Sequence, residues 1–160
     1  MALNVTDTAL REGLVASLAV PRWVQDVASL APFESLDVLL AVAYDAATPL
    51  SVDEIEQAIA HHPRIGEKPK GEGTSQAFSR AEQGADTEFA DEIAAGNRAY
   101  EERFGRVFII RAAGRSRAEI LAEIHRRLEL DDATELAIVG EQLRDIALLR
   151  LEKLFGGDAA

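Results

Sequence analysis

The stretch "PLSVDEIEQAIAHHP", residues 49–63, contains the start, the amphipathic body and the end of one helix. Ser51 is followed three residues later by Glu54, which is the spacing of a capping box at a helix N-terminus. Pro63 ends the pattern because proline disfavours the helical conformation of the preceding residue, His62. We therefore predict a helix that begins after Ser51 and ends near His62.

Helical patterns continue on both sides of this stretch. Upstream, residues 8–19 and 34–47 are rich in Ala and Leu at amphipathic spacing. Downstream, helical character is expected from about 75 to 103, with a break around 84–86 or at Gly96. Helices thus account for most of the chain.

The C-terminal part of the chain repeats the same signals. "SRAEILAEIHRRLEL" opens with a second capping box, formed by Ser116 and Glu119. A last helix is predicted over about 132–155, with Asp132 or Thr134 as its cap. Six to eight helices are expected in total.

Two segments interrupt the helical pattern. Residues 64–74, "RIGEKPKGEGT", contain three glycines and a proline and cannot continue a helix. Residues 107–111, "VFIIR", form a short apolar run that is either a strand or a buried extended segment. No repeat of 20–50 residues is present. We predict an all-α, single-domain bundle over 1–160, with one buried extended segment, a core of about 14–155 and flexible termini.

The composition excludes several classes of protein. The chain has no cysteine, which excludes disulfides, thiolate metal sites and a Cys nucleophile. A net charge of −11 without a basic stripe argues against nucleic acid and membrane partners. No apolar run approaches the roughly 20 residues of a membrane span, and "MALNVTDTALREG" lacks a signal-peptide pattern. We therefore expect a cytoplasmic protein.

The adjacent residues His61 and His62 are two of the three histidines in the chain. Histidine exchanges a proton near neutral pH, so His62 at a helix end beside a loop is a candidate acid–base group. A histidine favoured there by the helix dipole is the preferred alternative from the sequence alone. A metal site is disfavoured, because neighbouring histidines are poorly placed for one ion and no His-Glu-x-x-His pattern exists. His125 is expected on a solvated helix face.

Three further features could bind a ligand. Ser79, Glu82 and Gln83 share one helix face and suit a ligand with amide and carboxylate groups, although a solvent-facing polar stripe is favoured. The extended segment within 106–114 would offer backbone groups to a ureide, although plain core packing is favoured. Arg150 follows two leucines and precedes a third, so it either meets a buried anion or extends to solvent at the core edge, with equal weight.

Four motifs in register support a resemblance that single residues do not. The chain resembles the OHCU decarboxylase family, the 2-oxo-4-hydroxy-4-carboxy-5-ureidoimidazoline decarboxylases of urate breakdown, from about residue 14 to residue 155. The motifs are "HPRIGEK" at 62–68, "SRAEQ" at 79–83, "NRAYEERFGRVFIIRAAG" at 97–114 and "LLRL" at 148–151.

The resemblance implies an all-α carboxy-lyase, commonly dimeric, that converts OHCU into (S)-allantoin and carbon dioxide without a cofactor or metal. It implies that His62 and Glu82 are catalytic and that Arg150 holds a substrate anion, with His61 a bystander. Arg111 departs from the family pattern, in which a small residue or Cys is frequent. The implied substrate-binding residues are Pro63, Ser79 and Gln83 together with the segment Phe108, Ile109, Ile110, Arg111 and Ala112.

Other functions stay open beside the decarboxylase. A non-catalytic ureide-binding or scaffold protein of the same fold would bind the ligand without turnover. The sequence argues against it, because a degenerate relative is expected to lose one of His62, Glu82 and Arg150, and all three are present. A metal-dependent hydrolase that uses His61 and His62 is a third, less favoured interpretation.

Overall fold

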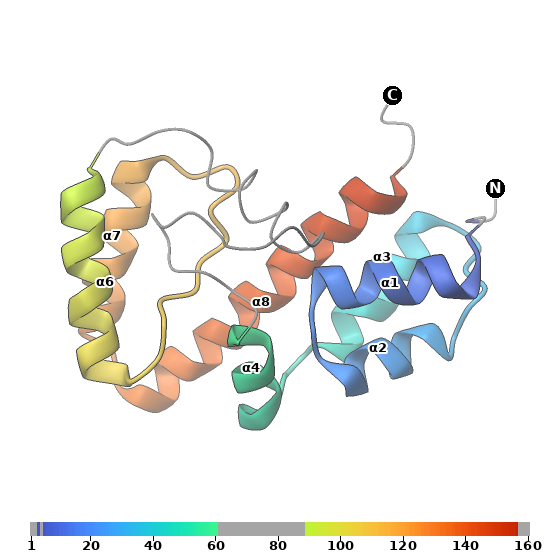
Figure 1. Cartoon of the computed structure of the whole chain (residues 1–160), viewed down its shortest axis with the longest axis horizontal. Helices are drawn as coiled ribbons and strands as arrows, with labels where there is room; N and C mark the ends of the chain where they lie inside the picture. Colours follow the sequence, from blue (N-terminus) through green and yellow to red (C-terminus); the bar gives the residue numbers. More distant parts are fainter. Residues whose placement is uncertain (1–2, 4, 61–88, 157–160) are drawn as a thin grey trace.

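The computed structural model describes Leu3 and the residues 5–60 and 89–156 (Figure 1). Seven helices and no strand lie in these ranges, which confirms the all-α prediction. No described helix combines the length and apolarity that crossing a bilayer requires. The helices are α1 (Asp7–Ser17), α2 (Pro21–Ala28), α3 (Leu36–Ala46), α4 (Val52–Ile59), α6 (Ala90–Phe104), α7 (Arg117–Leu128) and α8 (Asp132–Phe155).

Both predicted capping boxes are formed. At the start of α4 the Glu54 N–H donates to Ser51 Oγ at 3.1 Å, and the Ser51 N–H donates to Glu54 Oε1 at 2.9 Å. At the start of α7 the corresponding distances between Ser116 and Glu119 are 3.0 Å and 2.9 Å. The two short polar motifs therefore fix where these helices begin, as the sequence predicted.

The cap of α8 differs from the prediction. Asp131, not Asp132 or Thr134, is the N-cap, and its Oδ1 accepts the Thr134 N–H at 2.7 Å. Asp131 has extended backbone angles, whereas Asp132 is already helical. A cap must lie outside the helix to accept from its first turn, so the acidic residue one position earlier takes this role.

Helix α2 was not predicted from the sequence. Of the two positions at which a break was expected, 84–86 lies outside the described residues, and Gly96 does not interrupt its helix. Helix α2 has only eight residues, so it offers few turns for a periodic pattern, although Pro21 occupies its first turn. Gly96 lies inside α6 and does not interrupt it. A Cβ at Gly96 would lie 2.8 Å from Ile124 Cγ2 of α7, so this glycine permits the close packing of α6 on α7.

The helices form two groups that α8 connects (Figure 1). Helices α6 and α7 pack side by side at one end, and α1, α2 and α3 lie at the other. Helices α1 and α3 pack against α8 at that end, and α4 packs against α8 between the two groups. The buried apolar side chains of α1–α4 and α8, with Ile109, form a large cluster. A small cluster comprises Ile93, Tyr100, Phe108, Ile110, Ile120 and Ile124.

The segment from residue 107 to residue 112 runs between these two clusters without forming a helix or a strand. Ile109 belongs to the large cluster, whereas Phe108 and Ile110 belong to the small one. Successive side chains of an extended chain point to opposite sides, so this alternation is what an extended segment between two cores requires. The predicted buried extended segment is confirmed, and the strand alternative is not.

Candidate active site

The predicted site residues fall into two groups. His62, Pro63, Ser79, Glu82 and Gln83 lie within 61–88, outside the residues that the structure describes, and His61 lies there too. Arg150 and the segment Phe108–Ala112 are described. His125 is exposed on α7, as expected.

Arg150 is deeply buried on α8, where only 1% of its surface is exposed. It follows Leu143 and Ile146 at helical spacing and shares their inward face. Its Nη1 donates to the Ala16 carbonyl oxygen of α1 at 3.3 Å. The alternative in which Arg150 extends to solvent is therefore wrong, and the guanidinium lies in the interior, where a charged group requires acceptors or an anion.

The extended segment is held by three side chains. Arg127 Nη1 of α7 donates to the Ile109 carbonyl oxygen at 2.8 Å, and the Arg111 N–H donates to Gln142 Oε1 of α8 at 2.9 Å. Arg115 Nε also donates to the Arg111 carbonyl oxygen, at 2.9 Å. The backbone groups therefore take side-chain partners in place of a helix or sheet ladder.

Helix α8 links the segment to Arg150. Gln142 and Arg150 are eight residues apart on α8, which corresponds to a rise of about 12 Å along the helix. Ile109 also packs in the large cluster with Leu143 and Ile146 of α8. One helix thus positions both the buried guanidinium and the extended backbone to which the family resemblance assigns substrate binding.

Arg111 is half-buried in this segment. Its backbone N–H is fixed by Gln142, whereas its side-chain Nε is buried and finds no hydrogen-bond partner among the described residues. Its backbone is therefore anchored independently of its side chain.

Sequence reasoning missed a buried polar network beside the segment. Arg127 and Glu135 are fully buried and paired, with Nε 2.8 Å from Oε1 and Nη2 2.5 Å from Oε2. The Tyr100 hydroxyl donates to Glu135 Oε2 at 2.5 Å. A signal was present, because Arg127 follows Ile120 and Ile124 at spacings of seven and three residues, which places a charge on an apolar helix face.

The charges within this network compensate each other, because Arg127 pairs with Glu135. Burial raises the pKa of the Tyr100 hydroxyl far above its ordinary value, and the hydrogen bond to the Glu135 carboxylate adds to this, so the hydroxyl stays a donor. The Arg127 guanidinium lies over the Phe108 ring, with Cζ 4.5 Å from the ring centroid. Arg127 thus contacts the segment at two points, the Ile109 carbonyl oxygen and the Phe108 ring.

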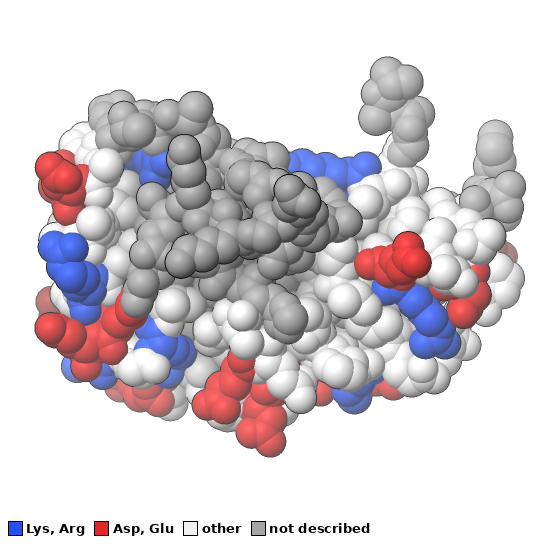
Figure 2. Space-filling view, in the orientation of Figure 1, with Lys and Arg blue, Asp and Glu red and all other residues white. Residues whose placement is uncertain are grey.

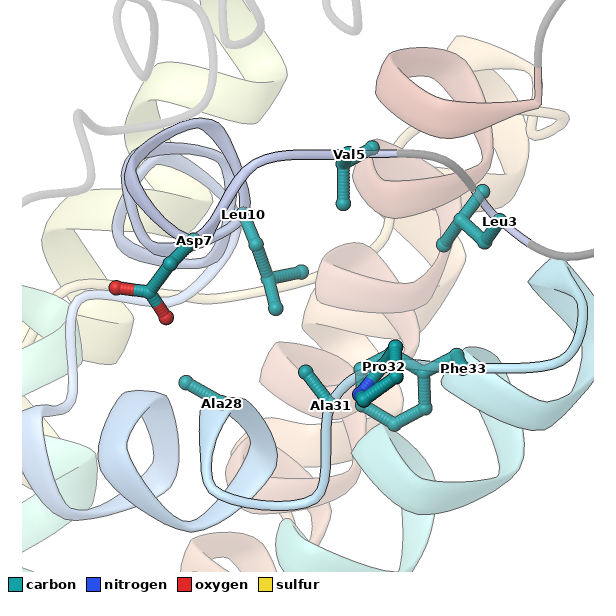
Figure 3. Close-up of a pocket in the computed structure, with 8 residues that line it drawn as sticks. All are labelled: Leu3, Val5, Asp7, Leu10, Ala28, Ala31, Pro32 and Phe33. Atoms are coloured by element: carbon teal, nitrogen blue, oxygen red, sulfur yellow. The ribbon is translucent and has the colours of Figure 1, made fainter.

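A pocket of about 290 Å³ lies elsewhere, between the N-terminal residues and the α2–α3 connection (Figure 3). It contains no predicted site residue, and its one ionisable lining residue, Asp7, pairs with Arg11 at 3.0 Å. In the described ranges no cluster of three or more His, Asp or Glu side chains could hold a metal ion. The pocket is lined by Leu3, Val5, Asp7, Leu10, Ala28, Ala31, Pro32 and Phe33.

Charged side chains of both signs are interspersed on the face shown in Figure 2. The chain as a whole carries a net charge of −11, which opposes an anionic ligand at long range. Screening with a Debye length of about 8 Å at physiological ionic strength limits this repulsion to short distances.

Comparisons with known proteins agree with this architecture. The model of the OHCU decarboxylase family matches residues 4–152. The Uric acid degradation bifunctional protein TTL of Arabidopsis thaliana is 33% identical over 117 residues, which cover 69% of this chain and 36% of the plant protein. A 2-oxo-4-hydroxy-4-carboxy-5-ureidoimidazoline decarboxylase of Haloferax volcanii is 28% identical over 140 residues, covering 85% of this chain and 83% of the archaeal protein.

A solved structure matches as well. The crystal structure of OHCU decarboxylase in the presence of (S)-allantoin superimposes with a TM-score of 0.73 at 26% identity, over 91% of this chain and 98% of that chain. This chain spans only about a third of the length of the plant relative, so the match there concerns one part of a longer protein. Because the family model spans nearly the whole sequence, this chain belongs to the OHCU decarboxylase family.

Proposed function

We propose that this chain decarboxylates OHCU to (S)-allantoin in urate breakdown, without a cofactor. The family match over residues 4–152 supports the reaction class. The observation that carries the proposal within the molecule is the buried guanidinium of Arg150, on the helix that also anchors the extended segment. A buried cation and main-chain hydrogen-bonding groups that the same helix positions suit a small ligand that is both anionic and rich in amide groups.

The substrate itself explains why no cofactor is required. Its carboxylate leaves a carbon next to a C=N group, so the bonding electrons move into that C=N as carbon dioxide departs. The nitrogen that receives these electrons takes a proton. The hydroxyl then loses its proton as its carbon becomes a carbonyl, and the neighbouring ureide-bearing carbon takes a proton. Because the electron sink is part of the substrate, the protein has only to orient the carboxylate and to deliver one proton to one face.

Arg150 and the extended segment serve orientation in this proposal. Arg150 holds a substrate anion, and the main chain of Phe108–Ala112 binds the ureide. Fixing the reacting groups in this way can supply several kcal/mol of the barrier reduction. The ureide-bearing carbon then presents one face to the proton donor, so a single enantiomer forms.

We assign the proton donor to His62 and the partner carboxylate to Glu82. A histidine general acid typically contributes about 10²–10⁴-fold. Glu82 either orients His62 or interacts with the substrate hydroxyl as its carbon becomes a carbonyl. Pro63, Ser79 and Gln83 complete the proposed substrate contacts.

The proposal is tested with OHCU generated from urate by purified enzymes. The decay of OHCU is followed by ultraviolet absorbance, and the chirality of the allantoin by circular dichroism. We expect faster decay and an excess of (S)-allantoin. Binding of (S)-allantoin without turnover would instead support the non-catalytic ureide-binding protein.

Paired variants test the assigned residues. His62→Ala should abolish turnover, whereas His61→Ala should keep most of it; the opposite result would exclude our choice of histidine. Arg150→Lys should raise KM, because an ammonium cannot reproduce the planar fork of the guanidinium. Arg144→Lys is the matched control on the same helix, since Arg144 pairs with Asp145 and lies over the Tyr44 ring.

The homodimer, which the family resemblance implies, and the cytoplasmic location, which the sequence favours, stay predictions. Light scattering of the purified chain measures its mass and thereby tests the homodimer. Fractionation of the source cells tests the location.

A further inference from the structure

We propose that Arg127, Glu135 and Tyr100, together with Gln142, are positioning residues that aim the main chain of Ile110 at the substrate ureide. This inference rests on the proposed function, because it concerns the backbone segment to which that function assigns the ureide. None of the four side chains is itself placed among the groups that contact substrate. They act through the peptide groups on either side of Ile110.

The geometry follows from the planarity of the peptide bond. In a trans peptide the C=O and the next N–H point in opposite directions. Arg127 Nη1 holds the Ile109 carbonyl oxygen at 2.8 Å and therefore fixes the direction of the Ile110 N–H. Gln142 Oε1 holds the Arg111 N–H at 2.9 Å and therefore fixes the direction of the Ile110 C=O. Two side chains from two helices thus set one donor and one acceptor on the same residue.

The Ile110 peptide groups are available for this role. Within the described residues, no hydrogen bond involves the N–H or the C=O of Ile110. The Ile110 side chain is packed in the small cluster, and only 3% of the residue is exposed. Buried main-chain groups require partners, and a ureide offers both an N–H and a C=O.

The network holds Arg127 rigidly in place. Glu135 accepts from Nε and Nη2 of Arg127, which leaves Nη1 directed at the Ile109 carbonyl oxygen. The Tyr100 hydroxyl donates to Glu135 Oε2 and fixes the carboxylate in turn. Three helices, α6, α7 and α8, therefore contribute to the placement of one carbonyl group.

Stability alone does not explain this arrangement. The desolvation of a buried ion pair offsets most of its electrostatic attraction. Apolar residues of similar volume therefore often stabilise a fold as well as the ion pair or better. An apolar replacement would, however, provide no donor for the Ile109 carbonyl. Positioning of the segment is therefore the property that only the polar network can supply.

The test compares three variants with one matched control. Gln142→Met removes the acceptor for the Arg111 N–H at similar volume, and Tyr100→Phe removes only the hydroxyl. The triple variant Arg127→Met/Glu135→Leu/Tyr100→Phe replaces the network by apolar groups. The control is Ser29→Ala, which removes a side-chain hydrogen bond to the Asp26 carbonyl oxygen at the end of α2 and touches neither the segment nor its anchors.

Two readouts are measured for every variant. The first is steady-state kinetics with the enantiomeric excess of the allantoin. KM and this excess do not depend on the fraction of the enzyme that is folded. The triple variant should lose about 10- to 100-fold in kcat/KM, mainly through KM, because a small misplacement of a binding group is costly. The (S) excess should fall. The control should change neither quantity.

The second readout is hydrogen exchange of the amides in 107–112, which does not depend on activity. Exchange there should accelerate in the triple variant and in Gln142→Met, while the amides of α1 and α3 keep their wild-type rates. If the variants fold and both the kinetics and the exchange stay within twofold of wild type, the inference is overturned. Should the triple variant fail to fold, Gln142→Met and Tyr100→Phe decide by the same criteria.

The two proposals can fail separately. If wild-type protein shows no turnover of OHCU, the proposed function fails, and the exchange rates alone then decide whether the network positions the segment. If wild type is active but the variants match it, only the positioning inference fails.

Discussion

The two ends of the molecule are stabilised in different ways. The α1–α3 end closes around the large cluster, whose buried members are apolar side chains from five helices, from the connections between them and from Ile109. The α6–α7 end has a small cluster of six buried residues, beside which the ion pair of Arg127 and Glu135 lies fully buried. Apolar packing is tolerant of exchange, whereas a buried ion pair with directed hydrogen bonds fixes a geometry. This difference agrees with the proposal that the polar network positions the extended segment, which runs between the two clusters.

Removing one partner of the buried pair should have the largest effect. Arg127→Met leaves the Glu135 carboxylate buried without its cation, and we expect a loss of about 3–5 kcal/mol in the free energy of unfolding. Urea denaturation measures it. The apolar triple variant should lose only about 1–3 kcal/mol, the cost of the unpaired Ile109 carbonyl. Equal losses in the two variants would show that a buried unpaired carboxylate costs no more than the unpaired Ile109 carbonyl. The contrast between the ion pair at this end and the apolar packing at the other would then fail.

Two helical glycines give a smaller, matched comparison. A Cβ at Gly96 would lie 2.8 Å from Ile124 Cγ2 in the small cluster, whereas a Cβ at Gly140 would lie 3.4 Å from Ile55 Cδ1 in the large one. Gly96→Ala should therefore destabilise by about 1–3 kcal/mol through overpacking. Gly140→Ala should be neutral or stabilise by about 0.5–1 kcal/mol through helix propensity. Thermal unfolding measures both, and stabilisation by Gly96→Ala would contradict a tight α6–α7 contact.

The smallest effect is expected at a partly exposed ion pair of the large-cluster end. Arg22 contacts Glu54 at 2.7 Å and lowers the pKa of that carboxyl from 4.5 to about 2. Because the pKa of Glu54 is lower in the folded state than its ordinary value, the ion pair stabilises the fold at pH values above about 4.5. This contribution disappears as the pH falls from about 4.5 through 2.

The matched variant is Glu54→Gln, which keeps a side-chain acceptor for the Ser51 N–H in the capping box. Wild type should exceed the variant by about 0.2–1 kcal/mol at pH 7, since 40% of the Arg22 side chain is exposed. The difference should vanish near pH 2, as measured by urea unfolding at several pH values. A difference that persists at low pH would point to a cause other than charge.

Much of the architecture could be predicted from short-range signals. The capping boxes at Ser51 and Ser116 fixed two helix starts, and the apolar run "VFIIR" marked the buried extended segment. Helix α2 was missed because eight residues carry little periodicity. The motif resemblance led to the OHCU decarboxylase family, which the family model supports over residues 4–152.

The buried polar residues separate what the sequence determines from what the tertiary structure decides. By itself, the sequence determined the helical content, the starts of α4 and α7, the extended segment and the family, because these depend on neighbours within a few residues or on motifs in register. Only the tertiary structure decided that Arg150 is buried and that Arg127 meets Glu135, Tyr100 and the Ile109 carbonyl. These partners come from different helices, and whether a charge on a helix face is buried depends on what packs against that face.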